Sequence, residues 1–127
     1  MKAWGKAFTF VDQPGQFREP MAFVSVIPRD ISSKKDLLQR LFEILQLPGY
    51  FGFNWDALND CLCDFHWIKQ TRIVILHEDL PKLDDQELRT YLDILMGAIL
   101  HWRSGMGHSL EVVFPKDALS RVSAILA

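Results

Sequence analysis

Three regularly spaced aspartates are the residues of this chain with the clearest chemical meaning. Asp56, Asp60 and Asp64 are four residues apart. On a helix each is turned by only about 40° from the last, so all three share one face. No Lys or Arg occurs between Arg40 and Lys69, and like charges at this spacing destabilise a helix slightly. The pattern therefore predicts an acidic helical face that binds basic groups of a partner.

The loop before these acids is rich in aromatic side chains, which are Tyr50, Phe51, Phe53 and Trp55. Gly52 lies between them, and Asn54 is a favourable residue to cap the start of a helix. Aromatic rings supply contact area, and carboxylates pair with Arg or Lys. An aromatic loop beside an acidic helix predicts a docking surface for a basic protein.

Other chemistry has weaker support in the residues. Asp56 and Asp60 leave open metal-assisted hydrolysis by a carboxylate pair, although two carboxylates satisfy few metals. Cys61 and Cys63 point about 200° apart on a helix, and with His66 they lack the spacing of a structural zinc site. The remaining histidines, His77, His101 and His108, are scattered, and no nucleotide-binding or nucleophile-elbow motif occurs. We therefore expect no enzyme, no cofactor and no metal.

Composition limits the class of protein. The 127 residues are 49% apolar and 24% charged, which suits a single domain, 1–127, with a sizeable core. The net charge of −2 argues against direct binding of nucleic acid through a strongly basic surface. No apolar run is long enough to span a membrane, and the start does not resemble a signal peptide. We expect a cytoplasmic protein that does not bind membranes.

Hydrophobic periodicity predicts the elements that position these residues. Buried strands are expected at 21–27, 73–76 and 110–114, and helices at 33–45, 54–65 and 88–100, with a last helix capped by Asp117. Apolar strands alternating with amphipathic helices imply an α/β fold with a mainly parallel sheet. Residues 1–20, with Trp4, Phe8 and Phe10, are expected to form a fourth strand, a dimer contact or a cover over an apolar patch.

Residues 47–62, LPGYFGFNWDALNDCL, resemble the signature of the barstar family, intracellular inhibitors of a secreted bacterial ribonuclease. The family pattern runs roughly L-P-x-Y-Y-G-x-N-x-D-A-L-x-D-x-L. The resemblance implies a three-stranded parallel sheet packed with helices, with residues 21–114 as the family core. Residues 1–20 would then be an N-terminal extension, with a possible extra strand, and 115–127 a helical C-terminal extension.

The resemblance also implies how the protein acts, as an inhibitor or immunity protein that plugs a nuclease active site. Asp56 and Asp60 would meet basic groups of the enzyme, Tyr50 would stack at the mouth of the active site, and Gly52 and Asn54 would shape the loop. The full expected partner-binding set is Tyr50, Phe51, Gly52, Asn54, Trp55, Asp56, Asn59, Asp60 and Asp64. The expected partner is a basic extracellular-type ribonuclease or toxin nuclease domain.

Three positions depart from the family pattern. Asn59 stands where the family often has Trp, and Phe51 replaces a Tyr. The family places a glutamate late in the helix before the last strand, whereas residues 100–105 here contain one Arg and no acid. A regulatory or scaffolding domain that binds another basic protein through the same face is therefore the alternative.

Overall fold

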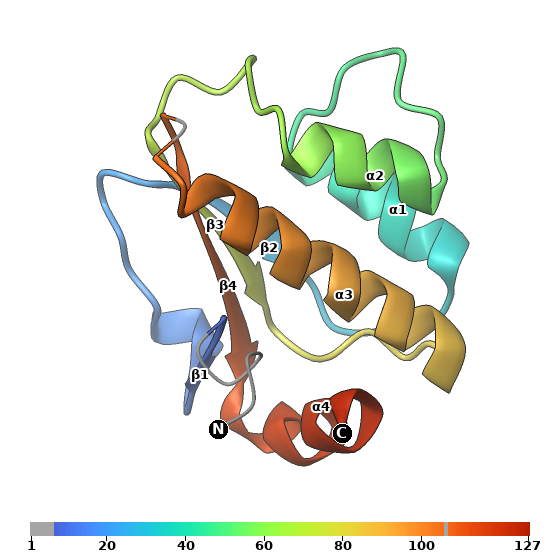
Figure 1. Ribbon diagram of the computed structural model, residues 1–127. Helices are drawn as coiled ribbons and strands as arrows, with labels where there is room; N and C mark the ends of the chain where they lie inside the picture. Colours follow the sequence, from blue (N-terminus) through green and yellow to red (C-terminus); the bar gives the residue numbers. More distant parts are fainter. Residues whose placement is uncertain (1–6, 106) are drawn as a thin grey trace.

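The structure is a computed structural model that describes residues 7–105 and 107–127, and it contains one parallel sheet flanked by helices (Figure 1). The strands are β1 (Phe8–Val11), β2 (Phe23–Ile27), β3 (Arg72–His77) and β4 (Ser109–Pro115). They pair in the order β1-β4-β3-β2, and every neighbouring pair is parallel. The helices are α1 (Lys34–Ile44), α2 (Trp55–Leu62), α3 (Asp85–Trp102) and α4 (Leu119–Leu126). The predicted α/β class is confirmed, with a fourth strand, β1, supplied by the N-terminal extension; Trp4 lies outside the described residues.

The two faces of the sheet are covered differently, because successive strand residues point to opposite faces. One face carries the main core, in which strand residues pack with α1, α2 and α3; its central strand residues are Ile73, Ile75, Val112 and Phe114. The opposite face carries a smaller cluster of Val74, Leu76 and Val113. The helices therefore gather on one side of the sheet, and α2 lies on the outer surface of that side (Figure 1).

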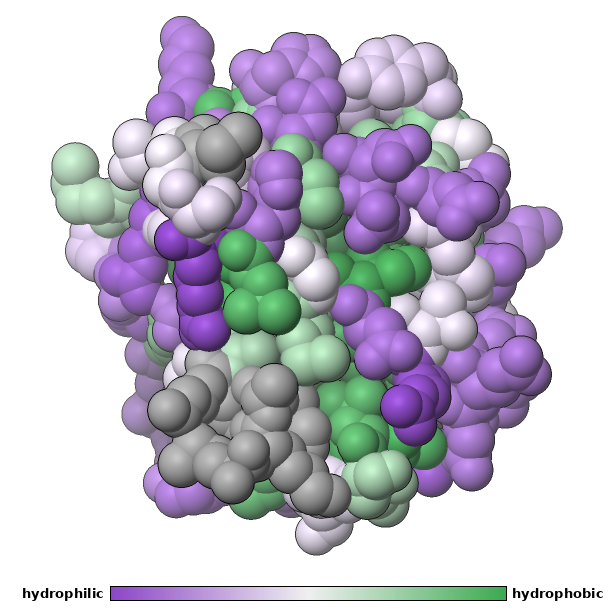
Figure 2. All heavy atoms as spheres, in the orientation of Figure 1, coloured by the Kyte–Doolittle hydropathy of each residue, from purple (hydrophilic) through white to green (hydrophobic). Residues whose placement is uncertain are grey.

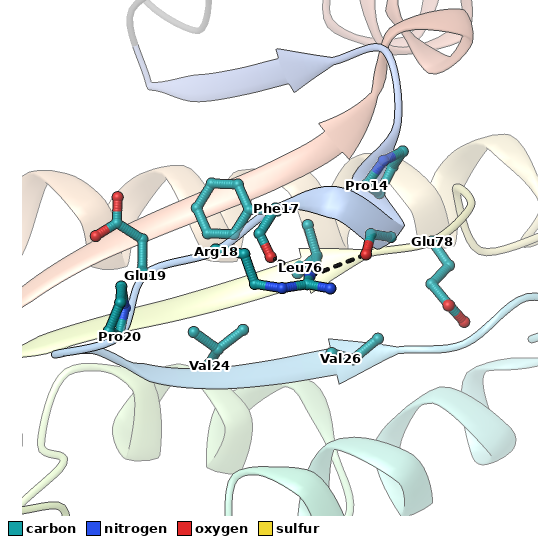
Figure 3. A pocket seen from close by; sticks show the side chains of 10 residues that line it. Pro14, Phe17, Arg18, Glu19, Pro20, Val24, Val26, Leu76 and Glu78 are labelled. Atoms are coloured by element: carbon teal, nitrogen blue, oxygen red, sulfur yellow. Dashed lines mark hydrogen bonds between the residues drawn. The ribbon is translucent and has the colours of Figure 1, made fainter.

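The connection from β1 to β2 crosses the face that the helices leave open. Phe17 and Ala22 of this connection pack on the smaller cluster, so the extension also covers an apolar patch. A groove of about 500 Å³ remains between this segment and β2, where Val24 and Val26 point toward the segment (Figure 3). These two side chains are 37% and 38% exposed. The prediction of a buried strand at 21–27 is thus wrong for this face, because β2 is an edge strand under a partial cover.

Two tryptophans from distant parts of the chain complete the ends of α1 and α2. The indole N–H of Trp67 donates to the carbonyl of Leu45 at 2.9 Å, just past α1. The indole N–H of Trp102 donates to the carbonyl of Leu62, the last residue of α2, at 2.7 Å. The last carbonyls of a helix have no partner within the helix, so these bonds supply one from outside. Both helices therefore end where the tertiary structure provides a donor.

Helix starts agree with the sequence at α1 and differ at α4. The hydroxyl of Ser33 accepts from the amide of Asp36 at 3.1 Å and caps α1, at the first residue of the helix predicted over 33–45. The predicted cap by Asp117 is wrong, because a 3-10 turn at Lys116–Ala118 runs directly into α4 and no side chain caps it. The turn continues into the helix, so Asp117 lies inside it rather than at a boundary.

Candidate functional site

The start of α2 is fixed by Asn54, the residue that precedes it. The Asn54 side-chain oxygen accepts from the amide of Ala57 at 2.8 Å, and its side-chain nitrogen donates to the carbonyl of Gly52 at 3.2 Å. A Cβ atom at Gly52 would lie 3.1 Å from that nitrogen, so a larger residue would press on the cap. One side chain thus joins the loop to the helix, as expected for residues that shape this region.

Asp56 and Asp60 lie one turn apart on the exposed side of α2, while Leu58, Cys61 and Leu62 on its other side are buried in the core. Both carboxylates are exposed. Within the part of the chain that the structure describes, neither makes a hydrogen bond or an ion pair. Figure 2 shows hydrophilic residues gathered over α2 on this face, with hydrophobic ones exposed along α3. Two unpaired charges on an ordered helix form a surface that is ready to bind cations.

Asp64 does not belong to this helical face, so the prediction of a helix over 54–65 is wrong at its end. The helix stops at Leu62, and Asp64 follows in a turn. Its carboxylate accepts from the amide of His66 at 3.2 Å, and such a local bond favours a turn over a helix. The same carboxylate lies 3.0 Å from Nδ1 of His66. Asp64 therefore has an internal partner, unlike Asp56 and Asp60.

The aromatic loop divides into exposed and buried rings. Tyr50 is 71% exposed and Phe53 is 43% exposed, whereas Phe51 is 4% exposed and belongs to the core. Partial desolvation and the nearby carboxylate of Asp64 raise the pKa of the Tyr50 hydroxyl, which keeps it a hydrogen-bond donor. Phe51 therefore supports the loop from behind, while Tyr50 and Phe53 face outward.

Phe53 is an exposed aromatic that the sequence analysis did not place among the site residues. Its φ of +52° is left-handed, which costs a residue with a side chain roughly 1–2 kcal/mol. Its ring centroid lies 4.9 Å from that of Phe51 and 5.1 Å from that of Phe42 on α1. In the sequence, Phe53 stands directly between Gly52 and Asn54, and this position is what could have indicated that Phe53 belongs to the site.

Trp55 connects α2 to both α1 and α3. The ammonium group of Lys34 lies 5.2 Å from the centroid of the Trp55 ring, a cation–π arrangement. On its other side, the Trp55 ring is 6.2 Å from the ring of Tyr91 on α3. Trp55 is half-buried, so it positions the start of α2 and also contributes to the surface.

Beneath this surface lies a buried polar pair that the sequence analysis did not identify. Nδ1 of His77 is 3.0 Å from the carbonyl of Val113, so it carries the proton and donates. Nε2 must then accept, and the Tyr91 hydroxyl donates to it at 2.7 Å. Burial lowers the pKa of His77 to about 3 and raises the pKa of Tyr91. Both groups are therefore neutral, and the pair joins β3, β4 and α3 under Trp55.

The remaining candidate residues include two cysteines, Cys61 within α2 and Cys63 at its end. Burial, together with Asp64 and Asp60, raises the pKa of the Cys61 thiol, and burial with Asp60 raises the pKa of Cys63, so neither is an activated nucleophile. Among residues 7–105 and 107–127, no three His, Cys, Asp or Glu side chains could together hold a metal ion.

Asn59 lies exposed on α2, between the two unpaired aspartates. No helix in the described part of the chain is long and apolar enough to cross a membrane.

Comparison with known families finds one match. A family model described as Barstar (barnase inhibitor) matches residues 21–115, which is well over half of the chain. The match includes the loop, α2 and all the strands except β1. No curated protein is similar enough to the chain to count as a match.

Proposed function

This chain belongs to the barstar family, and from that premise we propose that it inhibits a barnase-type ribonuclease by filling its active site with α2 and the loop before it. The partner in this proposal is a secreted ribonuclease with a basic cleft. The place of action is the cytoplasm, where such an inhibitor protects the cell from its own nuclease. No catalytic step is assigned to the chain itself.

The observation that carries the proposal is the pair of exposed, unpaired carboxylates on α2. A cleft that cleaves RNA must attract phosphates, and it does so with Arg and Lys side chains. Asp56 and Asp60 present negative charge from an ordered helix, and in residues 7–105 and 107–127 neither has a cation to release first. Binding would therefore gain charge-assisted hydrogen bonds at little cost in internal contacts.

The other site residues have supporting roles in this proposal. Tyr50 and Trp55 supply ring contacts, Asn59 supplies an amide between the two acids, and Gly52 with Asn54 fixes the loop against the helix. Phe51 acts from the core, by holding the loop in place. Asp64 lies at the edge of the surface, where its pairing with His66 reduces what it can offer a partner.

Calorimetric titration of barnase with the chain and two variants tests the proposal. We expect tight binding by the wild type and a loss of about 2 kcal/mol or more in Asp60→Asn, roughly 30-fold in affinity. Asp117→Asn is the matched control, since it removes the same charge from an exposed position just before α4, which lies away from α2 (Figure 1). Equal affinity of all three proteins would contradict the role of α2, and no binding by the wild type would contradict the proposed function.

A further inference from the structure

The surface around α2 continues onto a groove at the start of α1. This groove has a volume of about 330 Å³ and is lined by Lys34, Lys35, Leu38, Gln39 and Phe53. Leu38 is buried and forms the floor, while the exposed ring of Phe53 forms a wall. Phe53 directly precedes Asn54, the cap of α2, so the groove adjoins the face that carries the two unpaired carboxylates.

The rim of the groove is positively charged. Lys34 has its ammonium group over the Trp55 ring, and it makes no ion pair with a carboxylate in the described part of the chain. Lys35 is exposed and has no ion-pair partner among those same residues. An apolar floor and wall beside two ammonium groups are complementary to an apolar side chain that has a carboxylate next to it.

The ring of Phe53 is held at the groove by its neighbours. A left-handed φ is adopted at lower cost by Gly or Asn than by an aromatic residue. The rings of Phe42 and Phe51 nevertheless hold Phe53 in this conformation with 43% of the residue exposed.

We propose that this groove binds an apolar side chain of the ribonuclease together with an adjacent carboxylate, beside the basic cleft that α2 fills. The inference rests on the proposed function and adds a specificity determinant to it. Ribonucleases with a basic residue at the corresponding position would be repelled by Lys34 and Lys35, so the groove selects among them.

The chemistry of the groove is tested first without a ribonuclease. Amide NMR spectra of the whole chain are recorded during titration with N-acetyl-leucine, which carries an apolar side chain and a carboxylate, and with the uncharged N-acetyl-leucinamide. We expect shifts at residues 34, 35, 38, 39 and 53 with the acid, and clearly smaller shifts with the amide. Equal shifts with both probes, or shifts elsewhere only, would overturn the proposal.

The role of the groove in recognising a ribonuclease is tested with barnase. We expect Lys35→Glu and Phe53→Asn each to weaken binding at least fivefold; Asn tolerates the left-handed backbone, and circular dichroism verifies the fold. Lys69→Glu, an exposed lysine outside the groove, is the matched control and should bind as the wild type does. If Asp60→Asn weakens binding and both groove variants do not, the groove proposal is wrong while the proposed function stands. If the wild type does not bind barnase, the proposed function is wrong, and the NMR titration alone decides the chemistry of the groove.

Discussion

At the scale of single residues, the acidic side chains of the site are of two kinds. One is paired with another residue of the protein, and the others have no partner among the described residues. Asp64 is paired with His66, whereas Asp56 and Asp60 have no partner in the described residues. His77 is at the other extreme, since both of its ring nitrogens are hydrogen-bonded and the whole side chain is buried. In the proposed function the exposed acids serve binding, whereas the buried neutral pair of His77 and Tyr91 supports the fold beneath them.

The burial of His77 predicts how stability depends on pH. Its pKa is lowered to about 3 in the folded chain, against about 6.5 when unfolded, so only the unfolded chain takes up a proton between these values. The part of the free energy of unfolding that comes from the lowered pKa of His77 is therefore complete above about pH 6.5, and it is lost as the pH falls toward about 3. From pH 7 to pH 5 we expect the free energy of unfolding to fall by about 2 kcal/mol because of this group.

Urea denaturation at several pH values measures this dependence. His77→Gln should reduce the slope between pH 7 and pH 5, because it removes the buried imidazole. A wild-type slope that survives in His77→Gln would show that another group is responsible.

At the scale of elements, the end of α1 is a strained helix terminus that can be improved. The amide of Leu47 donates to the carbonyl of Phe42 at 3.0 Å, and the amide of Gln46 donates to that of Glu43 at 3.4 Å, the bonding pattern of a Schellman motif. This motif needs a left-handed residue, here Gln46 with φ of +54°, and glycine is the residue that adopts it most easily.

Gln46→Gly should therefore raise the free energy of unfolding by about 0.5–1 kcal/mol, measured by urea or thermal denaturation. Gln39→Gly in the middle of the same helix is the matched comparison, and it should destabilise by about 1 kcal/mol. Destabilisation by Gln46→Gly would mean that the Gln46 side chain contributes more than its backbone costs.

Some of the helix and strand boundaries could be predicted from the sequence, and others could not. The strands and the start of α1 follow from local patterns, namely short apolar runs and the Ser33 cap, and both are present. The end of α2 does not follow from such patterns. It depends on the turn at Asp64 and on the indole of Trp102, which is distant in sequence.

The candidate site, too, could be predicted from the sequence only in part. The exposure of Asp56 and Asp60 follows from helical periodicity, because their positions are opposite the apolar side of α2. The burial of Phe51 and the exposure of Phe53 do not, since adjacent aromatics in a loop have no fixed periodicity. Their placement depends on Phe42 of α1, which only the tertiary structure brings beside them.

At the scale of the whole molecule, the charge distribution matters more than the total. A net charge of −2 alone would give little attraction to a basic partner. Two carboxylates without a partner among the described residues, those of Asp56 and Asp60, lie on α2, while Lys34 and Lys35 lie at the neighbouring groove. The fold keeps these opposite charges at separate places on one side of the sheet, which suits a partner whose cleft is basic and whose adjacent surface is acidic.

Inhibition through α2 is tested most directly by measuring RNA cleavage by barnase in the presence of an equimolar amount of this chain. With both proteins at a concentration between the dissociation constants of the wild type and of Asp60→Asn, we expect cleavage to stop with the wild type and with Asp117→Asn, and to return in large part with Asp60→Asn. Tight binding that leaves cleavage unchanged would contradict inhibition and support the scaffolding alternative. Cleavage that continues in the absence of binding would contradict the account as a whole.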